Sequence, residues 1–80
     1  MKWKMYSIKD ELQGFTTPIP MANDDMAKRY FREQQKVNTT ISNEPGDFSI
    51  WSMGEFDTET GIYEQMADYP KLIERGVKHD

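Results

Sequence analysis

The 80-residue chain has no cysteine, one histidine and no long hydrophobic run. The absence of cysteine excludes disulfides and thiolate metal sites. No run approaches the roughly 18 apolar residues that a membrane-spanning helix requires. The first ten residues, MKWKMYSIKD, also lack the apolar core of a signal peptide. We therefore expect a soluble, intracellular protein without a membrane partner.

Little in the sequence supports catalysis or metal binding. His79 lies next to the C-terminus, whereas His-dependent nucleophiles and most zinc sites need a positioned imidazole. Asp57, Glu59 and Gly61 match a calcium loop only in part, because the EF-hand pattern has glycine at position six and here it falls at position five. A catalytic carboxylate pair needs an enclosing pocket, which so small a domain scarcely provides. The sequence predicts no enzyme, no metal and no cofactor.

The net charge of −4 is unevenly distributed. Residues 1–40 carry seven Lys/Arg and five Asp/Glu, a net +2, whereas residues 41–80 carry three and nine, a net −6. The whole chain therefore repels nucleic acid at long range, while one surface of its first half can attract it. Ordinary solubility charge explains the same asymmetry equally well.

Residues 47–64, DFSIWSMGEFDTETGIYE, hold the densest apolar and aromatic run and predict a β-hairpin. Strand-favouring residues precede Gly54, and a Pro-Gly pair precedes them. The following DTETG suits a turn in which Gly61 takes a positive φ and Asp57 accepts backbone hydrogen bonds.

Side chains alternate along the first strand of this hairpin. Phe48 and Ile50 therefore point to one face, and Trp51 and Met53 point to the other. One helix covers only one face of a short sheet, and exposed Trp and Met in one patch usually mark an interface. We predict a homo-oligomer with Trp51 and Met53 at its interface.

The first twenty residues predict a strand over 3–8, a turn over 10–14 and a short strand over 15–19. Pro18 and Pro20 lack backbone donors, so the short strand must lie at an edge of the sheet or stop early. In the first strand, two apolar residues point to each face. Either face of that strand can therefore be internal.

The main helix is predicted to follow Asn23, a good N-cap, and to end at Asn38 and the two threonines after it. The aspartates of the first turn suit the helix dipole. One apolar stripe predicts the core side: Met26, Ala27, Tyr30, Phe31 and Val37. A basic stripe gathers on the opposite side: Lys28, Arg29, Arg32 and Lys36. Such a stripe is more often a solvated face than a binding site.

After the hairpin, Pro70 suits the first position of a short helix, predicted over Lys71–Arg75 with Gly76 as its end. Residues 78–80 are expected to fray. The predicted organisation is one α+β domain over residues 1–65 and a C-terminal extension over residues 66–80. The domain has a largely antiparallel sheet of three to four strands with one main helix on one face. Its predicted core is Met5, Ile19, Met26, Tyr30, Phe31, Phe48, Ile50, Phe56 and Ile62.

The order of several short motifs resembles the small nonstructural protein of microviruses, single-stranded DNA phages of the gokushovirus type. The motifs are MYSIKD, a Pro-containing segment, a helix with Ala27, Arg29 and Phe31, and EPGDFSIWSMGEFDTETG. The family shows PEDY-x-LF-x-x-GEFD-x-x-TG at the matching place. The resemblance spans roughly residues 4–63 and departs at Gly46, where an acidic residue is usual.

The resemblance implies a protein made during infection, in the cytoplasm of the host cell, and absent from the virion. The family is commonly described as acting in viral single-stranded DNA synthesis or as DNA-binding. If the protein binds single-stranded DNA, the candidate residues are Lys2, Trp3, Lys4, Lys28, Arg29, Arg32 and Lys36. The alternative is an oligomeric interaction module that engages a viral replication or assembly protein or a host factor.

Overall fold

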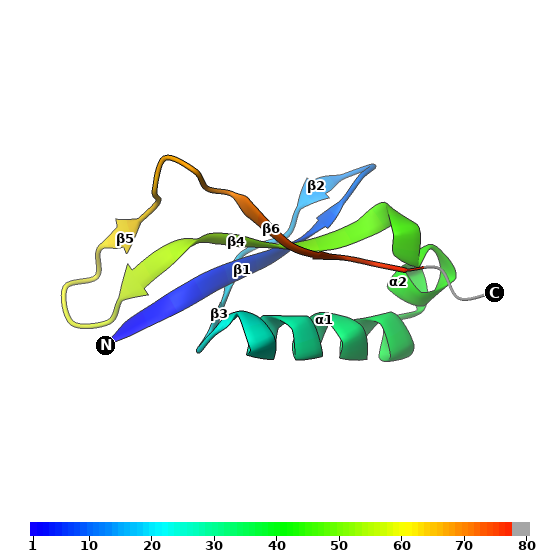
Figure 1. Ribbon diagram of the computed structural model, residues 1–80, viewed down its shortest axis with the longest axis horizontal. Helices are drawn as coiled ribbons and strands as arrows, with labels where there is room; N and C mark the ends of the chain where they lie inside the picture. The colour runs from blue at the N-terminus through cyan, green and yellow to red at the C-terminus, as the bar shows by residue number, and fades with distance from the viewer. Residues whose placement is uncertain (78–80) are drawn as a thin grey trace.

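Two long antiparallel strands, β1 and β4, form the centre of the computed structural model, which describes residues 1–77 (Figure 1). His79 and the end that was expected to fray lie outside the described residues. The elements are β1 (Lys2–Asp10), β2 (Gly14–Phe15), β3 (Ile19–Met21), α1 (Asp24–Val37), α2 (Thr39–Asn43), the 3₁₀ turn η1 (Pro45–Asp47), β4 (Phe48–Asp57), β5 (Tyr63–Glu64) and β6 (Lys71–Arg75).

The six strands form one antiparallel sheet that is four strands wide. β1 pairs with β4 along its whole length, from Lys2 opposite Asp57 to Asp10 opposite Phe48. Each edge of the sheet is formed by two short strands. β2 and β3 pair with β1, and β5 and β6 pair with β4. The α+β class is as predicted, but three to four strands was too few. A proline, Pro18, separates β2 from β3, so the expected single edge strand is split.

Local sequence signals set both ends of α1. The side chain of Asn23 accepts a hydrogen bond from the backbone N–H of Met26 at 2.9 Å, as expected of an N-cap. The helix ends at Asn38, whose side chain then caps α2 by accepting from the N–H of Ile41 at 3.3 Å. The two threonines after Asn38 therefore begin a second helix, where the sequence predicted only a stop.

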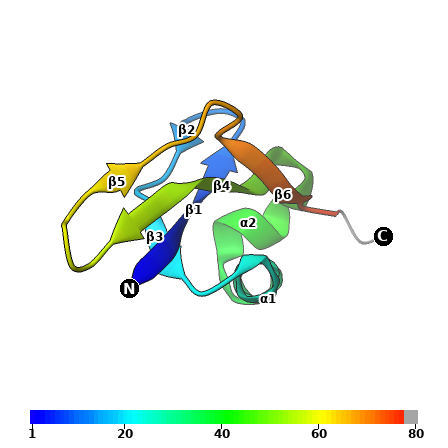
Figure 2. The ribbon, with the colours of Figure 1, turned by 60° about the vertical axis from the view of Figure 1, so that its left-hand side comes forward.

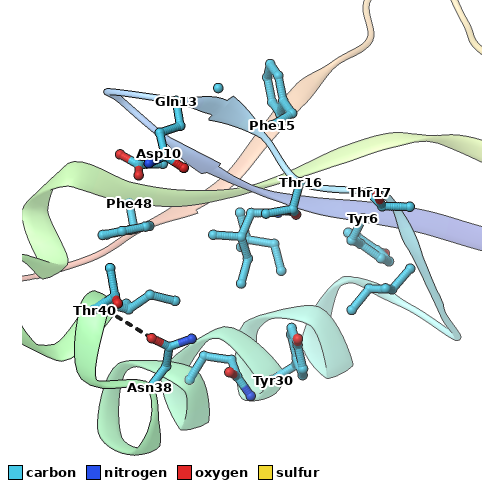
Figure 3. A pocket seen from close by; sticks show the side chains of 16 residues that line it. Tyr6, Asp10, Gln13, Phe15, Thr16, Thr17, Tyr30, Asn38, Thr40 and Phe48 are labelled. Carbon is cyan, nitrogen blue, oxygen red and sulfur yellow. Dashed lines mark hydrogen bonds between the residues drawn. The ribbon is translucent and has the colours of Figure 1, made fainter.

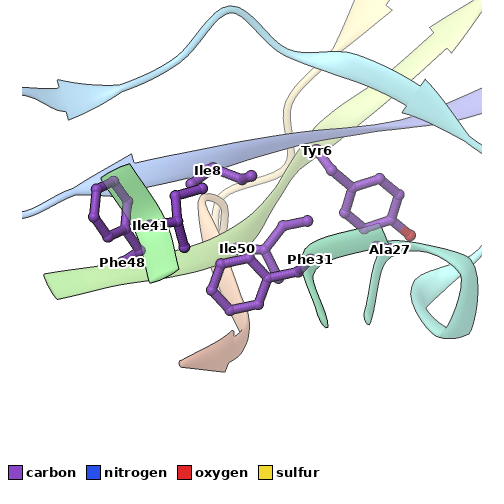
Figure 4. Close-up of a cluster of buried hydrophobic side chains, with 7 residues drawn as sticks. All are labelled: Tyr6, Ile8, Ala27, Phe31, Ile41, Phe48 and Ile50. Atoms are coloured by element: carbon purple, nitrogen blue, oxygen red, sulfur yellow. The ribbon is translucent and has the colours of Figure 1, made fainter. Parts of the chain in front are cut away.

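The core lies between α1, α2 and one face of the sheet (Figure 4). β1 and β4 contribute alternate side chains to it, and the two helices contribute Ala27, Phe31 and Ile41. The buried apolar residues are Tyr6, Ile8, Ala27, Phe31, Ile41, Phe48 and Ile50. Phe31, Phe48 and Ile50 were predicted correctly, and Tyr30 packs half-buried against this cluster.

Five residues predicted for the core lie outside it: Met5, Ile19, Met26, Phe56 and Ile62. Ile19, Met26 and Ile62 are exposed, and so is Val37 of the predicted apolar stripe. Met5 is half-buried on the other face, because Tyr6 and Ile8 are the residues of β1 that turn toward α1.

Phe56 was misplaced by a β-bulge in β4. Gly54 pairs with Met5 and Ser52 pairs with Tyr6, so Met53 has no partner in β1. Beyond the bulge the alternation of β4 reverses. Phe56 then lies opposite Trp3, on the face that does not meet α1.

The predicted hairpin is present as β4 and β5. Gly61 has a φ of +73°. The Asp57 carboxylate accepts the N–H of Glu59 at 2.9 Å, and this hydrogen bond lowers the pKa of Asp57. β5 contains only two residues, so the main partner of β4 is β1.

The short helix predicted over Lys71–Arg75 is wrong, because this segment is the strand β6. It pairs with β4, with Arg75 opposite Ser49 and Lys71 opposite Ser52. The helix signal was local, whereas the open edge of β4 offers unpaired backbone groups that the segment satisfies. No helix within residues 1–77 is long and apolar enough to span a membrane.

A hydrogen bond joins β1 to the first turn of α1. The hydroxyl of Tyr6 donates to Oδ1 of Asp24 at 2.6 Å. Burial and then this hydrogen bond raise the pKa of Tyr6 far above its usual range. A tyrosine whose pKa is raised by folding stabilises the fold below its unfolded pKa of about 10, and this contribution disappears as pH rises through the folded pKa.

We predict that Phe31→Ala lowers the free energy of unfolding by about 3–5 kcal/mol, because it empties the centre of the core. Urea denaturation measures the change. Val37→Ala on the exposed side of the same helix is the matched control and should cost less than about 0.5 kcal/mol. A loss below about 1 kcal/mol for Phe31→Ala would contradict this placement of α1.

We predict that Gly76→Ala destabilises the docking of β6 by about 1–3 kcal/mol. The N–H of Gly76 donates to the carbonyl of Phe48 at 2.9 Å, and an added Cβ would overlap the backbone carbonyl of Pro45. Gly46→Ala is the control, since nothing lies near a Cβ at that position. Equal thermal stability of the two variants would show that the close approach at Gly76 is absent.

We predict that the free energy of unfolding falls more steeply between pH 9 and 11 in the wild type than in Tyr6→Phe. This range is centred on the pKa of about 10 that Tyr6 has in the unfolded chain. The buried hydroxyl resists ionisation in the folded state only, so high pH favours unfolding. Urea midpoints at several pH values give the comparison. Parallel pH profiles for the two proteins would rule out a raised pKa of Tyr6 in the native state.

Candidate nucleic-acid interface

The four basic residues of α1 lie on the side of the helix that faces away from the core. Arg29, Arg32 and Lys36 are exposed and Lys28 is half-buried. We call these four residues the basic stripe. Within residues 1–77, Lys28, Arg29 and Lys36 form no salt bridge. Their charges therefore face solvent and are accessible to an anionic ligand.

Arg32 differs from the other three because β6 holds it in place. Its Nη2 lies 2.7 Å from Oε1 of Glu74, and its Nε lies 3.2 Å from Oε2. This two-point contact raises the pKa of Arg32, mainly through the hydrogen bond to Glu74. The arginine is oriented by the carboxylate and partly neutralised by it. Among the described residues it is the one cation of the basic stripe that forms a salt bridge.

A hollow of about 520 Å³ lies between α1 and β6, and we call it the α1–β6 hollow. Its lining combines three cations with one carboxylate and two uncharged residues. The lining residues are Arg32, Gln35, Lys36, Glu74, Arg75 and Val77. Arg75 belongs to the edge strand β6, so the hollow reaches the edge of the sheet. Arg75 was not among the predicted site residues, because the sequence predicted a helix there without indicating its neighbours.

Lys2 and Lys4 lie at the N-terminal end of β1, where they pair with Asp57 and Glu55 of β4, respectively. Each lysine therefore has a carboxylate across the strand pair, which offsets its charge. Trp3 lies between them and points to the opposite face by the alternation of the strand. Trp3 therefore lies on the sheet face opposite α1 and its basic stripe, whereas Lys2 and Lys4 share the alternation of Tyr6 and Ile8 and lie on the core side of the sheet.

The sheet face turned away from α1 carries no helix in the part of the chain that the structure describes (Figure 2). We call it the open face. Strand alternation and register assign its residues. They are Trp3, Met5, Ser7, Lys9, Phe15, Pro20, Ser49, Trp51, Gly54, Phe56, Tyr63, Leu72 and Arg75.

Trp51 and Phe15 form an edge-to-face pair on the open face. Their ring centroids are 5.8 Å apart and the planes meet at 81°. Lys9 Nζ lies 5.5 Å from the Phe15 centroid and 5.7 Å from the Trp51 centroid, within cation–π range. The indole Nε1 of Trp51 donates to Oγ of Ser49 at 2.8 Å, which fixes the ring over the sheet.

Met53 was expected beside Trp51, but it occupies the β-bulge. It has no partner in β1, and its side chain is half-buried. Its carbonyl accepts a hydrogen bond from the hydroxyl of Tyr63 at 2.9 Å. Trp51 therefore has Phe15 and Lys9 as its aromatic and charged neighbours, a grouping that the spacing of Trp51 and Met53 did not predict.

A second hollow of about 660 Å³ opens between the sheet and the two helices (Figure 3). Tyr6 and Phe48 form part of its apolar floor, whereas Phe15 points away from it. Among the described residues that line it, Asp10 is the one carboxylate, and it accepts the N–H of Leu12 at 2.9 Å. A lone carboxylate provides no acid–base pair. Within residues 1–77, no group of three His, Cys, Asp or Glu side chains could hold a metal ion.

Comparison with known proteins gives a family for the chain. The family model of the phage ORF5 protein matches residues 3–79. No curated protein and no solved structure matches the chain. The matched region includes all of β4 and the basic stripe, together with the strand β6 that completes the α1–β6 hollow. The chain therefore belongs to the phage ORF5 protein family.

Proposed function

We propose that this phage protein is a non-enzymatic, nonstructural protein of a microvirus of the gokushovirus type. In this proposal it binds single-stranded DNA weakly during viral DNA synthesis, in the cytoplasm of the infected host cell. The motif order described above supports the microvirus assignment. The observation that carries DNA binding is the exposed basic stripe of α1, continued by Arg75 at the α1–β6 hollow.

Phosphate groups suit this surface for electrostatic reasons. Nonspecific binding of single strands comes mainly from Lys and Arg contacts to phosphates, which release counterions. The basic stripe offers three side chains without a salt bridge in the described residues, and Arg32 adds a fourth whose position is fixed by Glu74. A backbone that follows α1 would meet these cations in succession.

The overall charge of −4 opposes such binding, but the molecule is elongated, with extents of 45 × 20 × 17 Å. The carboxylates Glu55, Asp57, Glu59 and Glu64 belong to the β4–β5 hairpin. The C-terminal part of α1 and the strand β6, whose residues line the α1–β6 hollow, lie toward the other end of the molecule (Figure 1). Charges separated by more than about 8 Å are largely screened at physiological salt. α1 itself carries four Lys/Arg and three Asp/Glu, a net +1, so a strand that lies along α1 meets a small positive charge rather than the −4 of the whole chain.

We predict that replacing Lys28, Arg29 and Arg32 by Gln together weakens binding to single-stranded DNA of any sequence. It should also reduce the salt-dependence slope by up to about two units, because each phosphate contact on a single strand contributes about 0.7. Fluorescence anisotropy of a labelled oligonucleotide at several salt concentrations measures both. Equal binding by the triple variant would remove this surface from the proposal.

Glu74→Gln is the matched variant of opposite sign. It removes the one carboxylate among the described residues that line the α1–β6 hollow and releases Arg32, so affinity should rise. The pair is solvent-exposed on the arginine side, so its loss should cost little stability, about 0–1 kcal/mol. Absence of single-stranded DNA binding by the wild type at low salt would reject the proposed function itself.

The alternative is an oligomeric interaction module that engages a viral replication or assembly protein or a host factor. The observation that favours it is the aromatic surface of the open face, where Phe15 is 43% exposed beside Trp51. If this alternative holds, light scattering at micromolar concentration gives a dimer or larger mass, and Trp51→Ala returns it to a monomer. A monomer mass for both proteins would exclude an assembly through Trp51.

A further inference from the structure

We infer that the open face is the surface on which bases of the single strand stack, with Trp51 and Phe15 as the stacking residues. This inference rests on the proposed function and adds a second surface to it. In this arrangement the basic stripe of α1 binds phosphates, and the open face binds unstacked bases. The two surfaces make different physical predictions, because one acts through charge and the other through aromatic contact.

The aromatic content of the open face carries the first part of the argument. Phe15 and Trp51 form one aromatic group. A second aromatic group consists of residues that pair across β1, β4 and β5, namely Trp3, Phe56 and Tyr63. All five rings are at least partly exposed on a sheet without a covering helix. Every base has a π-face, so successive bases of a single strand can stack on such rings without a sequence requirement.

The rigidity of Trp51 supports stacking over nonspecific apolar contact. Its indole is held by the hydrogen bond to Ser49 and forms an edge-to-face contact with Phe15. The serines beneath are fully covered, since Ser7 and Ser49 are each only 1% exposed. A ring that is already fixed loses little conformational entropy when a base stacks on it.

The charges of the open face indicate an anionic partner. Lys9, Ser49 and Arg75 are opposite one another in register across β1, β4 and β6. Within residues 1–77, none of the strand residues assigned to this face is acidic, although the chain as a whole carries −4. A second copy of the same face would bring cations toward cations with no carboxylate to pair them, so the face is not self-complementary.

Arg75 connects the two surfaces. It lines the α1–β6 hollow beside Arg32 and Lys36. It also shares the row of Lys9 on the open face. β6 is an edge strand, so a nucleic-acid backbone can pass from α1 around this edge without crossing a covered part of the sheet. The phosphates then follow a line of cations while the bases turn toward Trp51.

Tryptophan fluorescence tests the inference. Trp3→Phe leaves Trp51 as the single tryptophan of the chain. We expect an oligothymidylate to quench Trp51 emission as it binds, and an abasic phosphodiester of equal length to bind more weakly without quenching. Binding is followed independently by anisotropy of the labelled strand. Oligothymidylate that binds without a change in Trp51 emission overturns the inference and leaves the proposed function intact.

Substitutions separate stacking from charge. Trp51→Leu and Phe15→Leu should each weaken binding by about 5-fold to 150-fold, the range for losing one stacked base. The salt slope should be unchanged, because neither variant removes a charge. Trp51→Phe retains an aromatic ring and should recover most of the affinity. Leu12→Ala, an exposed apolar residue outside the open face, is the control and should bind normally.

Circular dichroism and thermal unfolding establish that each variant is folded. Normal affinity of folded Trp51→Leu and Phe15→Leu overturns the inference. The inference is also overturned if, without DNA, Trp51 emission changes with protein concentration and the protein has a dimer mass. In that case a second copy covers the open face. A wild type that does not bind single strands at low salt rejects the proposed function and this inference together.

Discussion

The pairing of β1 with β4 is the constraint on which the rest of the structure depends. These strands are distant in sequence but adjacent along their whole length, and every other strand attaches to an edge of this pair. The same pair supplies Tyr6, Ile8, Phe48 and Ile50 to the core. Bringing distant segments together costs loop-closure entropy, which this long ladder and its buried face offset.

A chain of 80 residues has only one main helix with which to cover this pair. One sheet face is therefore buried under α1 and α2, and the other is occupied by small serines under larger, partly exposed rings. This division separates the chemistry of the two sides. The helical side presents the basic stripe to solvent, and the open face presents aromatic rings with Lys9 and Arg75.

The β-bulge of β4 determines which rings share the open face. Without the bulge, Phe56 would lie on the same face as Phe48 and Ile50 and would point toward the core. With it, Phe56 aligns with Trp3 and Tyr63. Gly54 has a φ of +142°, which a residue with a side chain rarely adopts, and the carbonyl of Glu64 occupies the place of its missing Cβ. The glycine therefore permits both the bulge and the close approach of β5.

The sequence by itself determined the elements whose signals are local. Asn23 and Asn38 delimit α1, and Gly61 closes the hairpin turn, because capping and turn geometry depend on a few adjacent residues. The basic stripe followed from helical spacing in the same way. Tertiary structure alone decided that 71–75 is a strand, that Tyr6 rather than Met5 faces the core, and that Arg75 and Phe15 join the candidate interface. These outcomes depend on which strand edge and which face a distant segment meets, and neighbouring residues do not encode that choice.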